Sequence, residues 1–331
     1  MIITRTPFRI SLFGGGTDFP DWYKINNGAV ISTSINRYCY ISCRKLPNFH
    51  DCKHRIVYSV IENVKELDDI KHPSVREVTK WSGIEYGLEI HHDGDLPARS
   101  GLGSSSSFTV GLINALMALQ EKRISKNKLA KEAIHIEQNI IKENVGSQDQ
   151  IAAAYGGFNL IEFKKNDTFD VKPIIASQQR QNFLNDHLML FYTGVSRISS
   201  EIAYETIQNL NKKEKIFFKL YDLLWEGLNV IESKTEDIKD IGRLLHESWL
   251  YKKEISNQIS TNFIDEIYKK AMENGALGGK ILGSGGGGFI LFFVPIEKKE
   301  LIKKLFINLT HVPFEFENSG SKVVVYEPNG L

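Results

Sequence analysis

The sequence predicts an α+β protein of two domains. Its 331 residues exceed the length of one ordinary domain, and a hydrophobic content of 42% is ample for packed cores. Both halves mix strand-like and helix-like segments without a regular strand–helix–strand alternation, which argues against a doubly wound sheet. A polar stretch at 164–186 separates the halves. We therefore expect an N-terminal domain over residues 1–180 and a C-terminal domain over residues 181–331.

The first half begins with strands. Residues 28–46 and 54–62 are rich in β-branched and aromatic residues, and a further strand within 86–97 ends at a turn cluster. From 104 to 120 apolar residues recur every three or four positions, which predicts a helix. A second helix is expected over 125–143, where the first residue is a serine suited to the N-cap.

The second half contains more helix. A strand at 187–194 precedes helical patterns from about 199 to 274. Residues 287–295 then return to strand, residues 298–306 to helix, and residues 321–329 form a terminal strand. These segments complete the α+β interpretation.

Charge and cysteine content argue against several classes of protein. The 41 Lys and Arg residues balance 40 Asp and Glu residues, so no global field attracts nucleic acid or an anionic membrane. The three cysteines, Cys39, Cys43 and Cys52, show neither a disulfide framework nor a zinc pattern. No apolar run approaches the roughly 18 residues of a membrane span. We expect a cytoplasmic protein without nucleic-acid or membrane partners; a homodimer stays open.

Three clusters of small residues stand out, at 8–19, 96–108 and 280–289. In the middle cluster, glycines and serines precede an apolar-periodic helix, so free backbone N–H groups and a positive helix end meet at one place. This arrangement holds phosphate without net charge. The serines alone also suit a helix cap and a turn. The cluster is not a Walker A loop, because no lysine stands in the required position.

The third cluster, "KILGSGGGGF", satisfies the G-x-G-x-x-G spacing at Gly283, Gly285 and Gly288. A dinucleotide-binding turn requires a strand before the glycines and a helix after them. Here a strand-like segment follows, and too little chain remains for a dinucleotide domain. The dinucleotide-binding interpretation therefore fails on its context, and a different phosphate loop or a linker stays open at this point.

Two acidic residues follow the middle cluster. Glu137 has Ile134 and Ile141 as neighbours on the apolar face of its predicted helix. A buried carboxylate needs a cation, either Lys or Arg or a divalent metal. Asp149 lies in a glycine-containing turn before a small-residue helix, where it suits either an N-cap or a catalytic role.

The first cluster places Arg9 on a strand before the glycines 14–16, which Thr17 and Asp18 follow. An arginine and a carboxylate around a glycine turn suit an anionic, hydroxyl-rich substrate. A plain turn with a surface ion pair has the same sequence pattern.

In this order, the three clusters resemble those of the GHMP kinase superfamily, named for galactokinase, homoserine kinase, mevalonate kinase and phosphomevalonate kinase. The resemblance spans nearly the whole chain and is most specific at P-x-x-x-G-L-G-S-S, residues 97–105. It implies an N-terminal domain like the second domain of ribosomal protein S5 and a ferredoxin-like C-terminal domain. It also implies ATP and Mg2+, with an ATP phosphate loop that comprises Pro97, Gly101, Leu102, Gly103, Ser104, Ser105 and Ser106.

The resemblance assigns further roles. It implies that the glycines at 283–288 are not a linker but support the phosphate loop and the substrate end of the active cleft. Ser105 and Glu137 match the Mg2+ ligands. Asp149 matches the catalytic base of galactokinase-like members, and Arg9 matches the arginine beside that base. The acceptor-binding residues are expected to be Gly14, Gly15, Gly16, Thr17, Asp18, Thr193, Gly194, Arg197, Gly285 and Gly286.

Two stretches of the sequence narrow the choice of acceptor substrate. "GGGTD" at 14–18 and "FYTGVSRISSEI" at 191–202 look like the bacterial D-glycero-D-manno-heptose 7-phosphate kinases. Such sugar 1-kinases phosphorylate the anomeric hydroxyl of the heptose 7-phosphate and so form the 1,7-bisphosphate. This product is used for the synthesis of nucleotide-activated heptose and of surface polysaccharide. Gly15 and Gly16 replace an acidic residue and a histidine of galactokinases, which argues against galactose. A fucokinase-like or other sugar 1-kinase and a catalytically inactive sugar-binding sensor are the alternatives.

A phosphate on the acceptor needs its own basic site. Arg197 is the first candidate, because a glycine and two serines nearby add hydrogen-bond donors. The other candidates are Arg5, Arg37 and Arg99.

Overall fold

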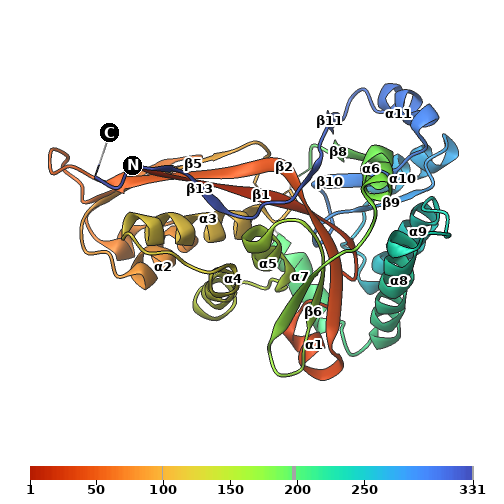
Figure 1. The fold of residues 1–331 in the computed structure, drawn as a ribbon, viewed down its shortest axis with the longest axis horizontal. Coiled ribbons are helices and arrows are strands. Elements are labelled where there is room, and N and C mark those ends of the chain that lie inside the picture. Colours follow the sequence, from red (N-terminus) through yellow and green to blue (C-terminus); the bar gives the residue numbers. More distant parts are fainter. Residues whose placement is uncertain (99, 196–198, 330–331) are drawn as a thin grey trace.

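The computed structural model describes residues 1–98, 100–195 and 199–329, and within them the chain builds two sheets. The larger sheet lies in the part of the molecule that holds both termini, and the smaller sheet lies beside the C-terminal helices (Figure 1). The two ends of the chain meet, because the Glu327 amide donates to the Met1 carbonyl at 2.8 Å. The mixture of helix and sheet confirms the predicted α+β class.

The larger sheet has nine strands within the described residues, in the order β13-β1-β2-β5-β3-β4, with β6 and β12 paired to β2, and β7 to β6. Its backbone is the long antiparallel pair of β1 and β2, which runs from Ile2 opposite Cys43 to Phe13 opposite Ile31. The strands are β1 (Ile2–Phe13), β2 (Gly28–Lys45), β3 (His54–Val57), β4 (Ile61–Val64), β5 (Leu88–Gly94), β6 (Phe158–Phe163), β7 (Phe169–Pro173), β12 (Phe316–Glu317) and β13 (Lys322–Tyr326).

Helices cover one face of this sheet (Figure 1). They are α2 (Pro73–Ser82), α3 (Ser104–Leu119), α4 (Lys126–Ile134), the π-helical turn η2 (His135–Ile140) and α5 (Gln148–Tyr155), and two further elements are α1 (Pro20–Asn26) and η1 (Leu67–Asp69). Helix α3 packs against β1 and β2 and is buried along most of its length. Burial suits this helix because its own residues are small or apolar on nearly every face. The sheet and this central helix therefore form the core that positions both ends of α3.

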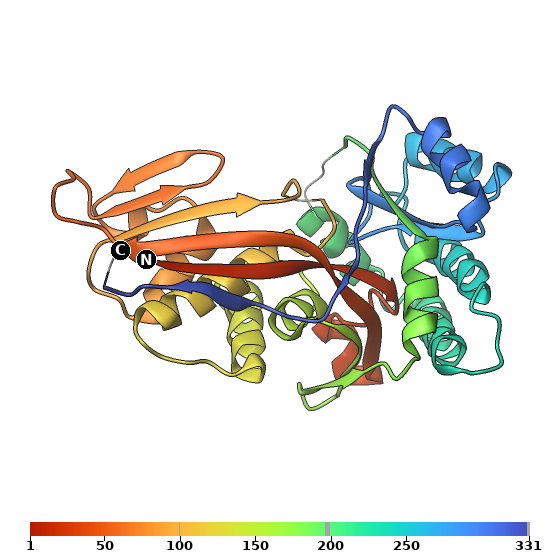
Figure 2. The same cartoon turned by 45° about the horizontal axis from the view of Figure 1, so that its top comes forward.

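The smaller sheet is antiparallel, with the order β11-β8-β10-β9, which is the strand order 4-1-3-2 of a ferredoxin-like sheet. In Figure 2, helices α8 to α11 lie at the end of the molecule away from the two chain termini. The elements of this half are α6 (Gln178–His187), β8 (Leu188–Tyr192), α7 (Ser199–Gln208), α8 (Glu214–Glu232), α9 (Asp240–Ile255), α10 (Asn262–Glu273), β9 (Gly278–Ile281), β10 (Phe289–Phe293), η3 (Ile296–Lys298), α11 (Lys299–Leu305) and β11 (Thr310–Val312).

The structure changes two of the predicted elements. The prediction of a single strand over 54–62 is wrong. This segment forms the hairpin of β3 and β4, and in its turn the Tyr58 amide donates to the Val60 carbonyl at 3.0 Å. The helix expected over 125–143 starts as predicted, with the Ser125 side chain capping it, but it becomes π-helical after Ile134 and ends at Ile140.

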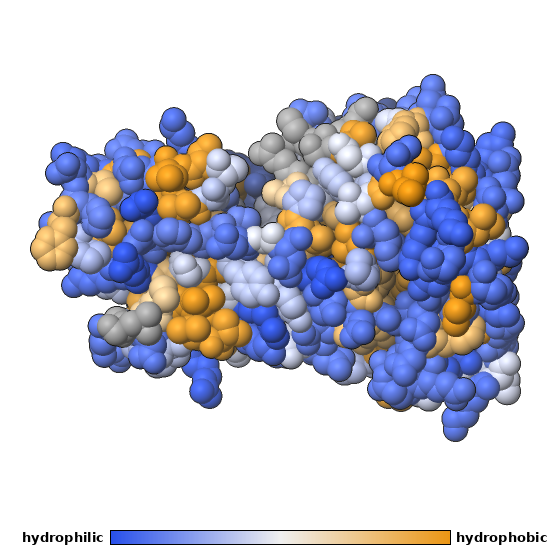
Figure 3. Space-filling view, turned by 90° about the horizontal axis from the view of Figure 1, so that it is seen from above, coloured by the Kyte–Doolittle hydropathy of each residue, from blue (hydrophilic) through white to orange (hydrophobic). Residues whose placement is uncertain are grey.

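The domain division at 180/181 stays a prediction. The larger sheet takes strands from both sides of it, since β12 pairs with β2 and β13 pairs with β1. Among the described residues no helix is long and apolar enough to cross a membrane. The face seen in Figure 3 is mostly hydrophilic, with separate hydrophobic patches.

Candidate active site

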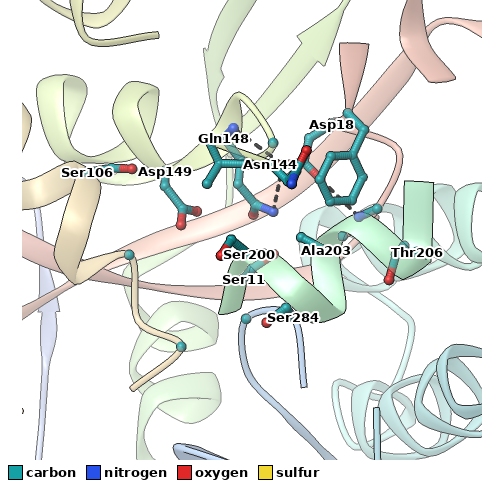
Figure 4. A pocket seen from close by; sticks show the side chains of 18 of the residues that line it. Ser11, Asp18, Ser106, Asn144, Gln148, Asp149, Ser200, Ala203, Thr206 and Ser284 are labelled. Atoms are coloured by element: carbon teal, nitrogen blue, oxygen red, sulfur yellow. Dashed lines mark hydrogen bonds between the residues drawn. The ribbon is translucent and has the colours of Figure 1, made fainter. Parts of the chain in front are cut away.

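A cavity of about 300 Å³ lies where the two halves of the chain meet. Its walls come from β1 and the turn after it, the N-terminus of α3, the start of α5, helices α7 and α9, and the turn between β9 and β10. Figure 4 looks into this cavity, with Ser200, Ala203 and Thr206 along α7 and the carboxylates of Asp149 and Asp18 at separate places on its wall. All three clusters of small residues therefore contribute to one site.

The middle cluster leads into the N-terminus of α3 at the cavity wall. Gly101 and Gly103 have φ of +84° and +74°, a left-handed conformation that glycine adopts without strain. No side chain caps α3 at Gly103, and Ser104, Ser105 and Ser106 line the cavity. An uncapped helix N-terminus at a cavity presents backbone N–H groups and a partial positive charge, which together suit phosphate.

Arg9 connects this loop to Asp149. Its Nε and Nη2 donate to the two carboxylate oxygens of Asp149, each at 2.8 Å, while its Nη1 donates to the Gly101 carbonyl at 2.7 Å. The bidentate geometry orients the Asp149 carboxylate in the first turn of α5. A Cβ at Gly103 would lie 3.3 Å from Asp149 Oδ2, so the phosphate loop and this carboxylate are in contact.

Glu137 is fully buried on η2, directly behind the serines of α3. Its Oε2 accepts hydrogen bonds from Ser106 Oγ, at 2.8 Å, and from Gln150 Nε2. Its Oε1 is buried without a hydrogen-bond partner in the described part of the chain. Burial raises the pKa of Glu137 to about 7, and the hydrogen bonds offset only part of that effect. Ser106 and Thr109 are thus the hydroxyl residues that interact with Glu137, whereas the family resemblance pairs Glu137 with Ser105.

The cation expected beside Glu137 is not an amino-acid side chain, since no Lys or Arg pairs with it among residues 1–98, 100–195 and 199–329. The same described residues hold no group of three His, Cys, Asp or Glu side chains that would bind a metal alone. One buried carboxylate with an orphaned oxygen, beside serine hydroxyls, nevertheless fits Mg2+, which takes one or two carboxylates and completes its shell with substrate phosphates and water.

Asp18 lies at the cavity wall beside Gln148. Its Oδ1 accepts from the Gly16 amide at 2.9 Å, and its Oδ2 accepts from Gln148 Nε2 at 3.0 Å. Burial raises its pKa, and the nearby charge of Asp149 contributes in the same direction. A Cβ at Gly146 would come within 1.9 Å of Asp18 Oδ2, so only glycine allows the loop before α5 to pack on this carboxylate.

The third cluster is the wall behind the phosphate loop. The Phe289 amide donates to the Ser100 carbonyl at 3.1 Å, and a Cβ at Gly283 would lie 2.6 Å from the Gly101 Cα. These approaches require glycine because two backbones meet. The expectation that "KILGSGGGGF" supports the cleft agrees with this geometry.

The other expected site residues fall into three groups. Gly15 and Gly16 line the cavity with Asp18. Arg197 and Arg99 lie outside the described residues. The cavity lining within the described residues does not include Pro97, which is exposed, Leu102, Thr17 and Thr193, which are buried, or Gly14, Gly194, Gly285 and Gly286.

These non-lining residues still hold the site together. Thr17 Oγ1 donates to the Gly14 and Ala29 carbonyls, both at 2.8 Å, and Thr193 Oγ1 donates to the Gly288 carbonyl, also at 2.8 Å. The Gly286 amide donates to the Ile259 carbonyl at 2.9 Å. Their contacts fix the turns that carry the lining residues.

Sequence reasoning missed two lysines of the cavity wall, Lys252 on α9 and Lys280 on β9. A signal for Lys252 was present: it follows Leu245 and Trp249 at the spacing i, i+4, i+7 and so lies on the apolar face of its helix. This is the same signal that identified Glu137. Nothing in the sequence singled out Ser200, Ala203 or Thr206.

Two family models and several known proteins match this chain. The family model described as "GHMP kinases N terminal domain" matches residues 56–157, and the one described as "GHMP kinases C terminal" matches residues 229–308. The chain is 31% identical to the D-glycero-alpha-D-manno-heptose 7-phosphate kinase of Campylobacter jejuni, with 97% of this chain and 98% of the relative covered. It is 29% identical to the galactokinase of Pyrococcus furiosus, with 91% of each covered.

A solved structure shows the same fold. The crystal structure of a D-glycero-D-manno-heptose 1-phosphate kinase from Bacteroides thetaiotaomicron superposes with a TM-score of 0.73 at 23% identity, over 99% of this chain and 100% of the other. With both family models matched and a relative above 30% identity along nearly its whole length, the chain belongs to the GHMP kinase family, and it is a phosphotransferase whose phosphate donor is ATP.

Proposed function

We propose that this protein transfers the γ-phosphate of ATP to the anomeric hydroxyl of D-glycero-D-manno-heptose 7-phosphate and so forms the 1,7-bisphosphate. The observation that carries the proposal is the Arg9–Asp149 pair, which contacts the phosphate loop at Gly101 and faces the cavity. The choice of acceptor draws on the similarity to the Campylobacter jejuni enzyme. Since ATP is the donor, we expect the reaction to occur in the cytoplasm.

Phosphoryl transfer requires positioning and stabilisation of negative charge more than covalent chemistry by the protein. We assign the ATP phosphates to the uncapped N-terminus of α3 and the loop from Gly101 to Ser105. Asp149 accepts or orients the proton of the anomeric hydroxyl, because each of its oxygens keeps a second lone pair beside the bond from Arg9. The anomeric hydroxyl is more acidic than an ordinary alcohol, which lowers the demand on this carboxylate.

We further propose that Glu137 and Ser105 hold Mg2+ with the ATP phosphates, and the orphaned Oε1 of Glu137 supports this assignment. When bound, the metal would neutralise charge on the phosphates. The Ser106 hydroxyl, which donates to Glu137 Oε2, orients the carboxylate for that role.

The test is an assay of ATP-dependent phosphorylation of heptose 7-phosphate, with the position of the new phosphate established by NMR. A bisphosphate substituted at C1 supports the proposal. Turnover of fucose or another unphosphorylated sugar in its place would identify a different sugar 1-kinase. Binding of the sugar and ATP without any turnover would identify a sensor that keeps the fold.

A further inference from the structure

Two lysines face the cavity from the C-terminal half of the chain. Lys280 on β9 is 4% exposed, and its Nζ donates to the Leu12 carbonyl at 3.0 Å. Lys252 on α9 is partly buried, and its Nζ donates to the Gly283 carbonyl at 2.6 Å and the Ile281 carbonyl at 3.2 Å. The partners in these bonds are neutral carbonyl groups.

An ammonium group has three N–H donors, so each lysine keeps at least one donor beyond these bonds. Neither lysine forms an ion pair with a carboxylate within the residues that the structure describes. A buried cation without an anionic partner is unfavourable, because the protein interior replaces its hydration poorly. The ligand-free site is therefore short of negative charge.

The neighbouring charges increase this shortage. Arg9 adds a third positive charge near the two lysines. The carboxylate of Asp149 already pairs with Arg9, so its charge offsets that of Arg9 rather than that of the lysines. Asp18 is a carboxylate that interacts with both lysines, and burial raises its pKa. Burial lowers the pKa of Lys280 to about 8 and that of Lys252 well below its usual value, and the nearby cations add to both effects. A phosphate dianion would reverse these effects.

We assign the lysines to the acceptor side of the cleft. Arg9 and Asp18 are the groups of the N-terminal half that interact electrostatically with both of them. Ser248, one turn before Lys252 on α9, lines the same cavity. Ser284, in the turn after β9, also lines it (Figure 4), and the two serines add hydroxyl donors. The α3 N-terminus, where we place the ATP phosphates, belongs to the other half of the chain.

Two of the arginines that the sequence suggested for binding the acceptor phosphate, Arg5 and Arg37, lie in the described part of the chain, and both have other partners. Arg5 stacks over the Tyr38 ring, 4.3 Å from its centroid, and faces Glu317. Arg37 donates to the carbonyls of Asn36 and Pro313. Neither lines the cavity.

We propose that Lys252 and Lys280 bind the phosphate monoester of the acceptor and so make the enzyme select a sugar phosphate over the corresponding free sugar. This inference rests on the proposed function and specifies its acceptor site. The ligand is a dianion at neutral pH, which matches two cations that have no carboxylate partner.

The main experiment compares Lys252→Met and Lys280→Met with the wild type on heptose 7-phosphate and on the same heptose without phosphate, at saturating ATP. We expect KM for the phosphorylated sugar to rise about 30-fold or more and KM for the free sugar to stay unchanged. Lys253→Met is the matched control, because Lys253 is the next residue on α9 and pairs with Asp265. An equal rise in KM for both sugars would assign the lysines to ATP or to the transferred phosphate. An unchanged KM for both sugars would show that the lysines do not bind the acceptor.

A measurement on the wild type keeps the inference testable even where a buried Lys→Met variant fails to fold. Inorganic phosphate is expected to inhibit competitively against the phosphorylated acceptor and not against ATP. Competition against ATP alone, or no inhibition by phosphate at millimolar concentration, would overturn the assignment.

The proposed function can fail separately. If heptose 7-phosphate is not a substrate, calorimetry with hexose 6-phosphates and inorganic phosphate still tests the lysines. Binding that Lys280→Met abolishes would retain the phosphate site with a different acceptor. A protein that binds ATP but none of these phosphates would refute the site itself.

Discussion

Arg9 and Asp149, which are 140 positions apart in the chain, share two parallel hydrogen bonds of 2.8 Å at the mouth of the phosphate loop. The third donor of Arg9 holds the Gly101 carbonyl of that loop. One side chain thus fixes the separation between the loop to which we assign the ATP phosphates and the carboxylate that we propose meets the acceptor hydroxyl. In a reaction that depends on alignment, such a link has direct kinetic consequences.

Asp149→Asn is expected to fold and bind ATP normally and to lose about 10²- to 10⁴-fold in kcat. The amide keeps the size of the side chain but removes the negative charge that orients or accepts the hydroxyl proton. Steady-state kinetics measure the loss, and calorimetry with a non-hydrolysable ATP analogue checks the binding. Turnover near that of the wild type would exclude Asp149 from the chemistry.

Glu137→Gln is expected to stabilise the ligand-free protein at pH 8 while it lowers Mg2+-dependent activity. The folded pKa of Glu137 is about 7, above the usual glutamate value of 4.5, so its contribution to stability is fully present below pH 4.5 and is lost as the pH rises through 7. Removing the buried charge should therefore add about 2 kcal/mol to the free energy of unfolding at pH 8, and nearly nothing at pH 4.5.

Thermal and denaturant unfolding at the two pH values check this prediction. Glu85→Gln is the control, because Glu85 is exposed and its substitution should have little effect at either pH. Equal stability changes of Glu137→Gln at pH 4.5 and pH 8 would show that ionisation of Glu137 is not the cause.

Gly283→Ala is expected to displace the phosphate loop and raise KM for ATP. Its Cβ would lie 2.6 Å from the Gly101 Cα, and its φ of +68° is strained for alanine. Gly83→Ala separates the two effects, because Gly83 has the same φ of +68° at the end of α2 but nothing within 4 Å of its Cβ. Both variants should lose about 1 kcal/mol or more of stability. An unchanged KM for ATP in Gly283→Ala would show that the wall does not position the loop.

The value of kcat/KM for a phosphorylated acceptor is expected to fall as the pH rises above about 8. Lys280 is protonated below its pKa of about 8 and loses its charge above it, while the acceptor phosphate stays a dianion. The charged groups that face Lys280 are Arg9, Asp18 and Lys252. Lys280→Arg should move the alkaline limb to higher pH. An identical pH profile for an unphosphorylated sugar would assign the limb to another group.

Local patterns predicted most of the fold. The apolar spacing at 104–120 matches α3 at Ser104–Leu119, and the β-branched segment at 28–46 matches β2 at Gly28–Lys45. The patterns failed where a turn was short or helix geometry changed, as at the hairpin of β3 and β4 and in η2. A tight turn inside an apolar run and an extra residue in a helical turn leave the hydrophobic pattern nearly unchanged, so the sequence alone does not reveal them.

By itself, the sequence determined the candidates for the chemistry: the three small-residue clusters, Arg9 and Asp149, and a carboxylate on an apolar helix face at Glu137. Only the tertiary structure decided which of them meet. It placed Gly283 against Gly101, Ser106 against Glu137, and two lysines from α9 and β9 in the same cavity. The physical reason is that a charged residue's partner is set by the packing of distant elements, whereas periodicity and spacing record only the environment along a single helix or strand.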